Sequence, residues 1–320
     1  MARWLVGAYG PDMDGTAPGV TVLRDRADGS LERDDALVAA LASPSFLAVD
    51  GDTVYAALEG SQEVVALDRA TLAVTERASS GGQWPCHVGV YDGTVVAANY
   101  GDGVLGVLGT APLALVQQVT ATGSGPHPAQ EGPHAHATFL LADGRVLSAD
   151  LGADRIHVHD LVDGRLERTA SIALPAGTGP RDVAQHSSGT ILVMGEHGNT
   201  ITILDERLEI VETVPVPGAQ PTDQGAGLAI AATGFVYTAL RGSNTIGVLR
   251  IDATGRTLEP VGSVSTAGDW PRHLVLGDGV VHVANQQSST VASFRLGPDG
   301  LPVLIGEPLT VANPTFLLRA

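Results

Sequence analysis

The segment GPHAHATFLLADGRVLSADLGADRIHVHD, residues 132–160, predicts three short β-strands joined by tight turns. The apolar first strand at 137–141 ends at Asp143-Gly144, a dipeptide that accommodates the backbone of a tight hairpin turn. The returning strand covers 145–150, and a polar break at 152–154 leads into a third strand at 155–159. Two histidines, His134 and His136, stand at the start of the first strand. The same pattern recurs along the chain, so this segment defines a repeating unit.

The repeating unit begins seven times, and a proline marks most of the beginnings. Aligned on that position, the first strands start at Pro44, Pro85, Pro133, Pro180, a degenerate position near Ala226, Pro271 and Pro314. Subtracting successive residue numbers gives steps of 41, 48, 47, 46, 45 and 43 residues. A period in the forties, built of strands and turns without helical periodicity, indicates a β-propeller with four-stranded blades. We therefore predict an all-β, seven-bladed β-propeller of antiparallel blades.

Both ends of the chain are predicted to complete the seventh blade. A single strand, at 313–318, follows the last beginning, whereas strands at 4–9 and 19–23 precede the first one. Pairing of 4–9 with 316–318 would close the ring. Because each blade packs on its neighbours, one ring of this length needs no second core. We therefore expect residues 1–320 to form a single β-propeller domain.

The composition restricts the possible partners. The chain has a formal net charge of −17, so its long-range field repels the phosphates of DNA, RNA and anionic membranes. A few local arginines could still hold a small anionic ligand. We expect a small-molecule substrate, no nucleic-acid or membrane partner, and a monomer or weak oligomer.

The cysteine content and the N-terminal residues indicate the cellular compartment. Cys86 is the only cysteine, so no intrachain disulfide can form and no oxidising compartment is required. The apolar run at 4–6 is too short for a secretory signal, and no stretch approaches 18 apolar residues. We therefore expect a cytoplasmic protein.

Propeller geometry predicts where chemistry can take place. The start of each first strand and the end of each second strand share one face, around the mouth of the central channel. The second strands end at Glu59, Asn99, Asp150, Glu196, Arg241 and Asn285. The first strands start near Cys86, His134, His136, Arg181 and Arg272.

Some of these residues have a simple structural explanation. Asn99, Asp150 and Asn285 are of the types that stabilise turns by bonding to nearby backbone groups. Glu196 and Arg241 are not turn formers, yet they occupy the equivalent position in their blades. A functional role is therefore a stronger hypothesis for these two.

Other chemistries lack their motifs. The chain contains no Gly-x-Ser-x-Gly, no phosphate-binding loop, no dinucleotide-binding fingerprint and no paired cysteines. Cys86 and His87 are adjacent in a strand and point to opposite sides, which favours a packed thiol over a catalytic dyad. A metal held by Glu59, Asp150 or Glu196 is geometrically possible, but arginines in the same ring would repel the cation. We expect no metal and no cofactor.

Over nearly its whole length the chain resembles the seven-bladed propeller lactonases, a family that includes bacterial 6-phosphogluconolactonases and fungal carboxy-cis,cis-muconate cyclases. The resemblance is carried by PCHVGVYDG and AANYGDG within 85–103, the segment from 132, GPR at 179–181, GEHGNTI at 195–201, LRGSNTI at 240–246, and WPRHL with VANQ within 270–286. It implies functional roles for the histidine seven residues before Asp143, which is His136, and for Arg181, Glu196 and Arg241. The sequence departs from the family at Asp182, where histidine is common, and near Ala226, where the strand start is reduced to small residues.

The resemblance implies a 6-phosphogluconolactonase-like hydrolase that opens a small anionic sugar lactone without a metal. Arg181 and Arg241 would bind the anionic group and stabilise the oxyanion, and Glu196 or His136 would deprotonate the attacking water. We assign His134, Arg272, Asn99, Asp150 and Asn285 to substrate binding.

Two alternatives stay open at this point. One is the reverse chemistry, a cycloisomerase that closes a muconate into a lactone. The other is a non-catalytic propeller that binds a ligand or a protein, because this fold serves many functions. Convergence of Arg181, Glu196, Arg241 and His136 on one cavity would favour an enzyme.

Overall fold

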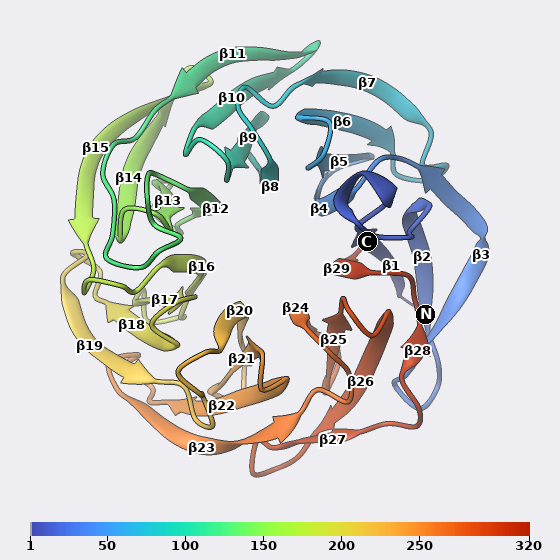
Figure 1. The fold of residues 1–320 in the computed structure, drawn as a ribbon, viewed down its shortest axis with the longest axis vertical. Helices are drawn as coiled ribbons and strands as arrows, with labels where there is room; N and C mark the ends of the chain where they lie inside the picture. Colours follow the sequence, from blue (N-terminus) through green and yellow to red (C-terminus); the bar gives the residue numbers. More distant parts are fainter. Residues whose placement is uncertain (1) are drawn as a thin grey trace.

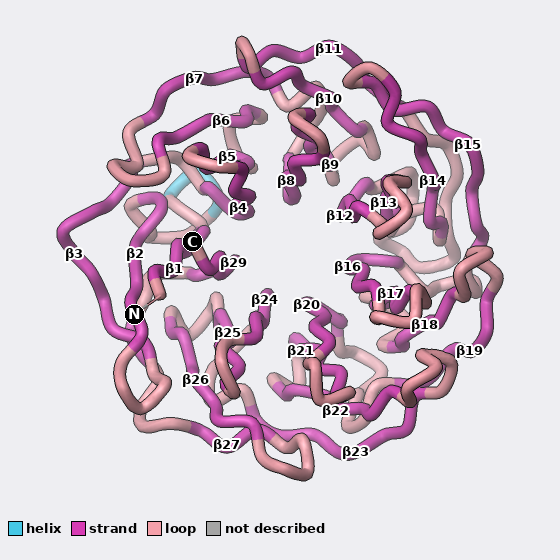
Figure 2. Tube along the Cα trace, turned by 180° about the vertical axis from the view of Figure 1, so that it is seen from behind, coloured by secondary structure: helices cyan, strands magenta, loops and turns pink. Residues whose placement is uncertain are grey.

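Seven β-sheets surround one axis in the computed structural model, which describes residues 2–320, apart from the side chains of residues 35–37. Figure 1 shows the sheets following one another around a disc, and Figure 2 shows the same ring from behind. Each sheet contains four antiparallel strands, and one sheet has a fifth, short strand. The predicted all-β, seven-bladed propeller is confirmed.

The first three blades follow the chain from the innermost strand outward. Blade 1 contains β4 (Pro44–Asp50), β5 (Thr53–Leu58), β6 (Glu63–Asp68) and β7 (Val74–Ser79). Blade 2 contains β8 (Pro85–Tyr91), β9 (Thr94–Asn99), β10 (Leu105–Thr110) and β11 (Leu113–Val119). Blade 3 contains β12 (Ala135–Leu140), β13 (Val146–Asp150), β14 (Arg155–Val162) and β15 (Arg165–Ala173).

The next three blades repeat this order. Blade 4 contains β16 (Pro180–Gln185), β17 (Ile191–Gly195), β18 (Thr200–Leu204) and β19 (Ile210–Pro215). Blade 5 contains β20 (Gln224–Ile230), β21 (Phe235–Arg241), β22 (Thr245–Ile251) and β23 (Leu258–Ser265). Blade 6 contains β24 (Pro271–Leu276), β25 (Val280–Asn285), β26 (Thr290–Leu296) and β27 (Pro302–Leu304), and β28 (Leu309–Thr310) also pairs with β26.

The seventh blade joins the two ends of the chain. Its innermost strand is β29 (Pro314–Arg319), followed outward by β1 (Arg3–Ala8), β2 (Gly19–Asp25) and β3 (Leu31–Ala40). Leu5 lies opposite Leu318, and Val6 lies opposite Leu317, in an antiparallel ladder. The predicted closure by the N- and C-terminal strands is therefore confirmed.

The central repeat has the predicted hairpin. Gly144 has a φ of 89°, a conformation that glycine adopts readily, and its amide donates to the carbonyl of Leu141 at 3.0 Å. One short element was not predicted, a single 3₁₀ turn, η1 (Pro11–Met13), between β1 and β2. It is too short to leave a helical pattern in the sequence.

Burial follows strand position. Every residue of the second strands β9 and β25 is buried, whereas five of the six residues of the outermost strand β7 are exposed. Apolar side chains pack between neighbouring blades, as where Leu5 and Val22 of blade 7 share one cluster with Leu58 and Leu67 of blade 1. Burial of these faces stabilises the ring by roughly 25 cal/mol per Å² of apolar surface.

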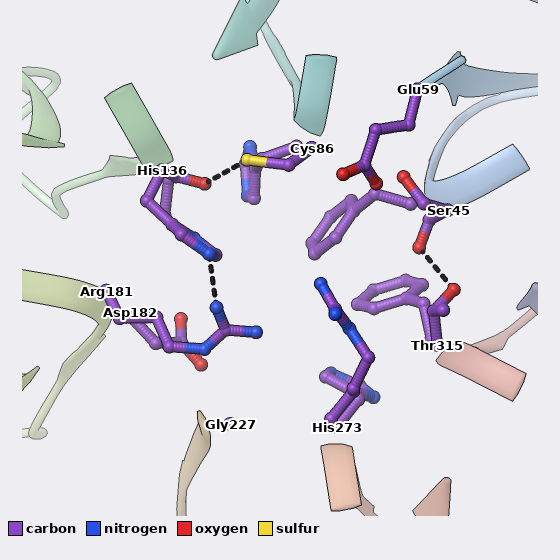
Figure 3. Close-up of a pocket in the computed structure, with 14 residues that line it drawn as sticks. Ser45, Glu59, Cys86, His136, Arg181, Asp182, Gly227, His273 and Thr315 are labelled. Carbon is purple, nitrogen blue, oxygen red and sulfur yellow. Dashed lines mark hydrogen bonds between the residues drawn. The ribbon is translucent and has the colours of Figure 1, made fainter. Parts of the chain in front are cut away.

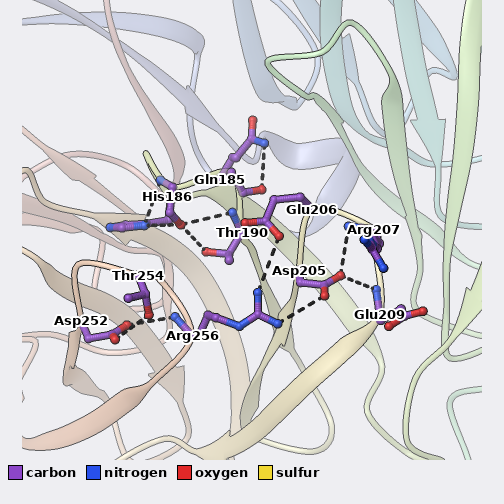
Figure 4. Close-up of polar contacts among 12 residues, drawn as sticks. Gln185, His186, Thr190, Asp205, Glu206, Arg207, Glu209, Asp252, Thr254 and Arg256 are labelled. Carbon is purple, nitrogen blue, oxygen red and sulfur yellow. Dashed lines mark hydrogen bonds and ion pairs between the residues drawn. The ribbon is translucent and has the colours of Figure 1, made fainter.

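Polar contacts on the face opposite the second-strand ends add connections between blades. Arg256, in the turn before β23, donates to Asp205 of blade 4 at 3.3 Å and lies 3.6 Å from Glu206 (Figure 4). The Arg256 side chain is half exposed, so these ion pairs contribute little to stability. The stability of the ring therefore depends mainly on apolar packing.

Candidate active site

A β-bulge at the start of each first strand turns one residue of the blade toward the axis. In blade 4, Pro180 pairs with Gly195 and Asp182 pairs with Met194, which leaves Arg181 as the extra residue. The same register shift leaves Ser45, Cys86, His136, Arg272 and Thr315 unpaired in their blades, and blade 5 has Ala226 and Gly227 there. Bulges re-aim side chains and are common beside active sites.

The pairing in blade 3 corrects the predicted alignment by two residues. Ala135 pairs with Asp150, as Pro180 pairs with Gly195 in blade 4. His136 is therefore the equivalent of Arg181, and the alignment of this blade on Pro133 was wrong.

Two adjoining cavities lie along the axis. The larger has a volume of about 630 Å³, and the smaller, shown in Figure 3, has a volume of about 70 Å³. Both are lined by Glu59, Cys86, His136, Arg181 and Arg272. Glu196 and Arg241 line the larger cavity, so all four residues predicted to be catalytic meet there.

Glu196 joins two arginines from different blades. Its Oε2 lies 3.1 Å from Nη1 of Arg181 and 2.6 Å from Nη2 of Arg241, and all three side chains are buried. Burial alone would raise the pKa of Glu196, but the Arg241 and Arg181 guanidinium groups outweigh it and lower the pKa. Glu196 is therefore a counter-ion that holds the two arginines together at the cavity wall.

His136 is held as a neutral imidazole. The Arg181 guanidinium donates to its Nε2, because a guanidinium has no acceptor atom, so the ring proton is on Nδ1. Nδ1 is buried and has no hydrogen-bond partner among residues 2–320. Burial, together with the facing Arg181, lowers the pKa of His136 well below its usual value.

A second group of polar residues faces this cluster. The Glu59 carboxylate, 7% exposed, accepts a hydrogen bond from the Tyr9 hydroxyl at 3.1 Å through Oε1. Its Oε2 is buried without a partner in the described part of the chain. Burial raises the pKa of Glu59, although Arg272 opposes that effect. The Arg272 guanidinium lies over the Tyr9 ring, 4.9 Å from its centroid.

Aromatic side chains surround the larger cavity. Trp84 and Trp270 each precede a proline that starts a first strand, and they have φ values of 53° and 60°. Bulky residues rarely adopt this left-handed conformation. His127, from the connection between β11 and β12, stacks on His197 with ring centroids 3.9 Å apart. The two Trp-Pro pairs, at 84–85 and 270–271, are the sequence signal for this aromatic rim.

Four of the residues assigned to substrate binding have structural contacts instead. The Asn99 and Asn285 amides donate to the carbonyls of Ser80 and Thr266, at 3.1 and 3.0 Å. Asp150 accepts from the backbone amide of His134 at 2.9 Å, and His134 Nδ1 lies 2.6 Å from the carbonyl of Tyr100. None of the four lines either cavity, and their placement favours the turn-stabilising explanation. Arg272, the fifth, does line both.

Cys86 and Asp182 have supporting roles. The Cys86 thiol contacts the carbonyl of His136 at 3.4 Å, and burial raises its pKa, so it is a packed, un-ionised thiol.

Asp182 accepts from the backbone amide of Leu228 in blade 5 at 2.9 Å. A Cβ atom at Gly227 would lie 3.0 Å from the backbone nitrogen of Leu274. Asp182 therefore contacts blade 5 at a strand start where the close packing leaves no room for side chains larger than those present.

No group of three or more His, Cys, Asp or Glu side chains in the described residues has a geometry that could hold a metal ion. Within the same residues, no helix is long and apolar enough to cross a membrane.

Comparisons with known proteins agree with this architecture. Residues 3–318 match the sequence model of the family described as lactonase, 7-bladed beta-propeller. The 6-phosphogluconolactonase of Bacillus subtilis (strain 168) is 28% identical over 306 residues, which cover 87% of each chain. A protein from Lactobacillus plantarum has a TM-score of 0.91 and 28% identity, with 99% of this chain and 98% of that chain covered. The periplasmic gluconolactonase of Pseudomonas aeruginosa has a TM-score of 0.91, 24% identity and the same coverage.

Proposed function

The chain belongs to the seven-bladed β-propeller lactonase family, and on that premise we propose that it hydrolyses a small sugar lactone in the larger axial cavity. The observation that carries the proposal is the convergence of Arg181 and Arg241 on one buried glutamate at the cavity wall. The name of the Bacillus subtilis relative supports a 6-phosphogluconolactone-like substrate.

The arginines of the cavity suit an oxyanion. Arg181, Arg241 and Arg272 face two buried carboxylates, Glu59 and Glu196, and the exposed Asp12 also lines the cavity, so these charges balance when all are ionised. Attack of water on the lactone carbonyl produces a tetrahedral intermediate with one negative oxygen. Fixed donors that face such an oxygen lower the barrier, because they need no reorganisation when the charge forms.

The fold fixes the positions of Arg181 and Arg241. Arg181 is the bulged residue of β16, and the Arg241 guanidinium donates to the carbonyl of Gly225 at 3.1 Å. Its position over Trp270, 5.6 Å from the ring centroid, limits its movement further. We propose that these two side chains bind the carbonyl oxygen or the anionic group of the substrate, with no metal required. Cytoplasmic location stays a prediction.

The experiment is a direct assay of lactone opening. Purified protein is mixed with δ-gluconolactone or 6-phosphogluconolactone, and acid release is followed against the spontaneous rate. We expect catalysis by the wild type, and a loss of most of it in an Arg181→Met, Arg241→Met double variant that still folds. If the wild type opens neither lactone, the proposed function is wrong.

A further inference from the structure

The reaction requires a group that accepts a proton from water, and three side chains at the larger cavity are of suitable type. His136 lies beside Arg181, whereas Glu59 lies across the adjoining smaller cavity from them (Figure 3). Glu196 pairs with Arg181 at 3.1 Å. Glu59 directly follows β5, and its backbone amide donates to the carbonyl of Ser43 at 3.1 Å, which fixes the start of its side chain.

Both groups on the Arg181 side face guanidinium donors. Glu196 Oε2 receives both guanidinium groups, at 3.1 and 2.6 Å. The Nε2 of His136 receives the Arg181 donor, and its Nδ1 carries the proton. A water bound near these atoms would meet donors, and donors cannot take its proton.

Glu59 has the opposite environment. One of its oxygens accepts from Tyr9, the other is buried with no hydrogen bond of normal geometry in the described structure, and the residue lines both cavities. A buried carboxylate oxygen without a partner is costly, because the desolvation of the charge is not repaid by a hydrogen bond. A water molecule or substrate hydroxyl in the cavity would satisfy it.

We propose that Glu59 is the general base that deprotonates the attacking water. This inference rests on the proposed lactone hydrolysis. One water proton passes to Glu59 Oε2 while the water oxygen bonds to the carbonyl carbon, and the carbonyl electron pair moves to the oxygen facing the arginines. When the intermediate collapses, the ring carbon–oxygen bond breaks, and the proton on Glu59 passes to the departing alkoxide. The product is the open hydroxy acid, and Glu59 is a carboxylate again.

The groups that face Glu59 determine the pH at which it can act. Burial raises its pKa, whereas Arg272 from blade 6, the nearby Ser45 hydroxyl of blade 1, Tyr9 from blade 7 and Arg181 from blade 4 lower it. The un-ionised Cys86 thiol of blade 2 also borders the cavity. Loss of the Tyr9 hydroxyl removes a hydrogen bond to the ionised carboxylate, so the pKa of Glu59 should rise.

The test compares variants by their pH–rate profiles. Glu59→Gln should lower kcat by about 10²- to 10⁴-fold, the usual contribution of a general base, and should remove the acid limb of the profile. Tyr9→Phe should keep an acid limb and move it to higher pH. The matched control is Glu63→Gln in the same blade, because Glu63 is half-buried, lines neither cavity and pairs with Arg77 at 3.2 Å. That control should keep the wild-type rate and profile.

The outcomes separate this proposal from the function on which it rests. A folded Glu59→Gln protein with the wild-type rate and acid limb would overturn the assignment. So would an acid limb that ignores Tyr9→Phe and disappears in His136→Asn or Glu196→Gln. If Glu59→Gln fails to fold, the Tyr9→Phe profile decides alone. A wild-type protein that opens no lactone contradicts the proposed function instead.

Discussion

Oε2 of Glu196 lies 2.6 Å from Nη2 of Arg241, across the boundary between blades 4 and 5. The glutamate follows the second strand of one blade, and the arginine ends the second strand of the next. The contact places a fixed cation at the cavity without leaving its charge uncompensated. It also makes the positions of two neighbouring blades interdependent at the site where we propose chemistry occurs.

Arg241→Met should lower turnover by about 10²- to 10³-fold, the effect expected for one lost oxyanion donor. Methionine keeps much of the side-chain volume but has no donor. The measurement is kcat on a sugar lactone, with a thermal melt to show that the variant folds. Arg250→Met is the control, because Arg250 is exposed on the same blade and lies over Phe235, 5.5 Å from the ring centroid. Equal losses in both variants would contradict a specific role for Arg241.

His136→Asn should lower the rate and keep the acid limb of the pH profile. The imidazole accepts from Arg181, so its loss frees that guanidinium to move, but it does not remove the proposed base. A titration of kcat between pH 4 and 8 checks this prediction. Disappearance of the limb would assign the proton to His136.

Glu59→Gln should stabilise the fold at neutral pH. The pKa of Glu59 is raised in the folded protein, so its ionisation opposes folding as pH rises from the unfolded value, about 4.3, through the folded value. Below the unfolded pKa both states are protonated, and the variant should match the wild type. Each unit of pKa difference corresponds to about 1.4 kcal/mol, measurable by urea unfolding at pH 4 and pH 7.

Glu196→Gln should have the opposite effect. The pKa of Glu196 is lowered, so its stabilising contribution is present above about pH 4.3 and is lost as pH falls through the folded pKa. Breaking a buried ion pair typically costs about 3–5 kcal/mol, and the variant should lose stability of that order at neutral pH. A stability change of the same sign in both glutamine variants would be inconsistent with the two environments described.

Exhaustive chelation should leave lactone opening unchanged. The carboxylates at the cavity share it with three arginines, and a bound divalent cation would be repelled by them. The measurement is activity before and after dialysis against a chelator. Loss of activity that a divalent cation restores would show that the proposal of metal independence is wrong.

The fold was predictable because its sequence signals are repeated in every blade. The geometry at the axis was not predictable. Seven strand starts and a strand missing after Pro314 were sufficient to predict both the blade number and the closure by 4–9. The register of the strands within one blade could not be predicted, since a β-bulge adds one residue without changing the residue types around it. The start of blade 3 was therefore placed at Pro133, two residues before the position that pairing gives to Ala135.

The individual site residues show the same limit. Glu196 and Arg241 stood out because long charged side chains occupy positions where turn residues are usual, whereas Arg181, at a strand start, was identified by the family resemblance. Asn99 and Asn285 were placed at the same position, but they pair with the proline of their blades as Gly195 does, one residue before the position of Glu196, and their amides donate to backbone carbonyls. The environment of Glu59 depends on a hydrogen bond from Tyr9, 50 residues earlier in the chain and in another blade, which no local pattern contains.

The bulge at the start of every first strand separates strand pairing from the lining of the axis. The extra residue has no partner in the ladder, so its identity is not constrained by the register of the sheet. Ser45, Gly227 and Thr315 are small residues at or beside such bulges that already border the smaller cavity. A different side chain at one of these positions would change the lining of the axial cavity in that blade alone, while the strand pairing stays the same. The architecture is therefore suited to the stepwise evolution, or the engineering, of new specificities on an unchanged ring.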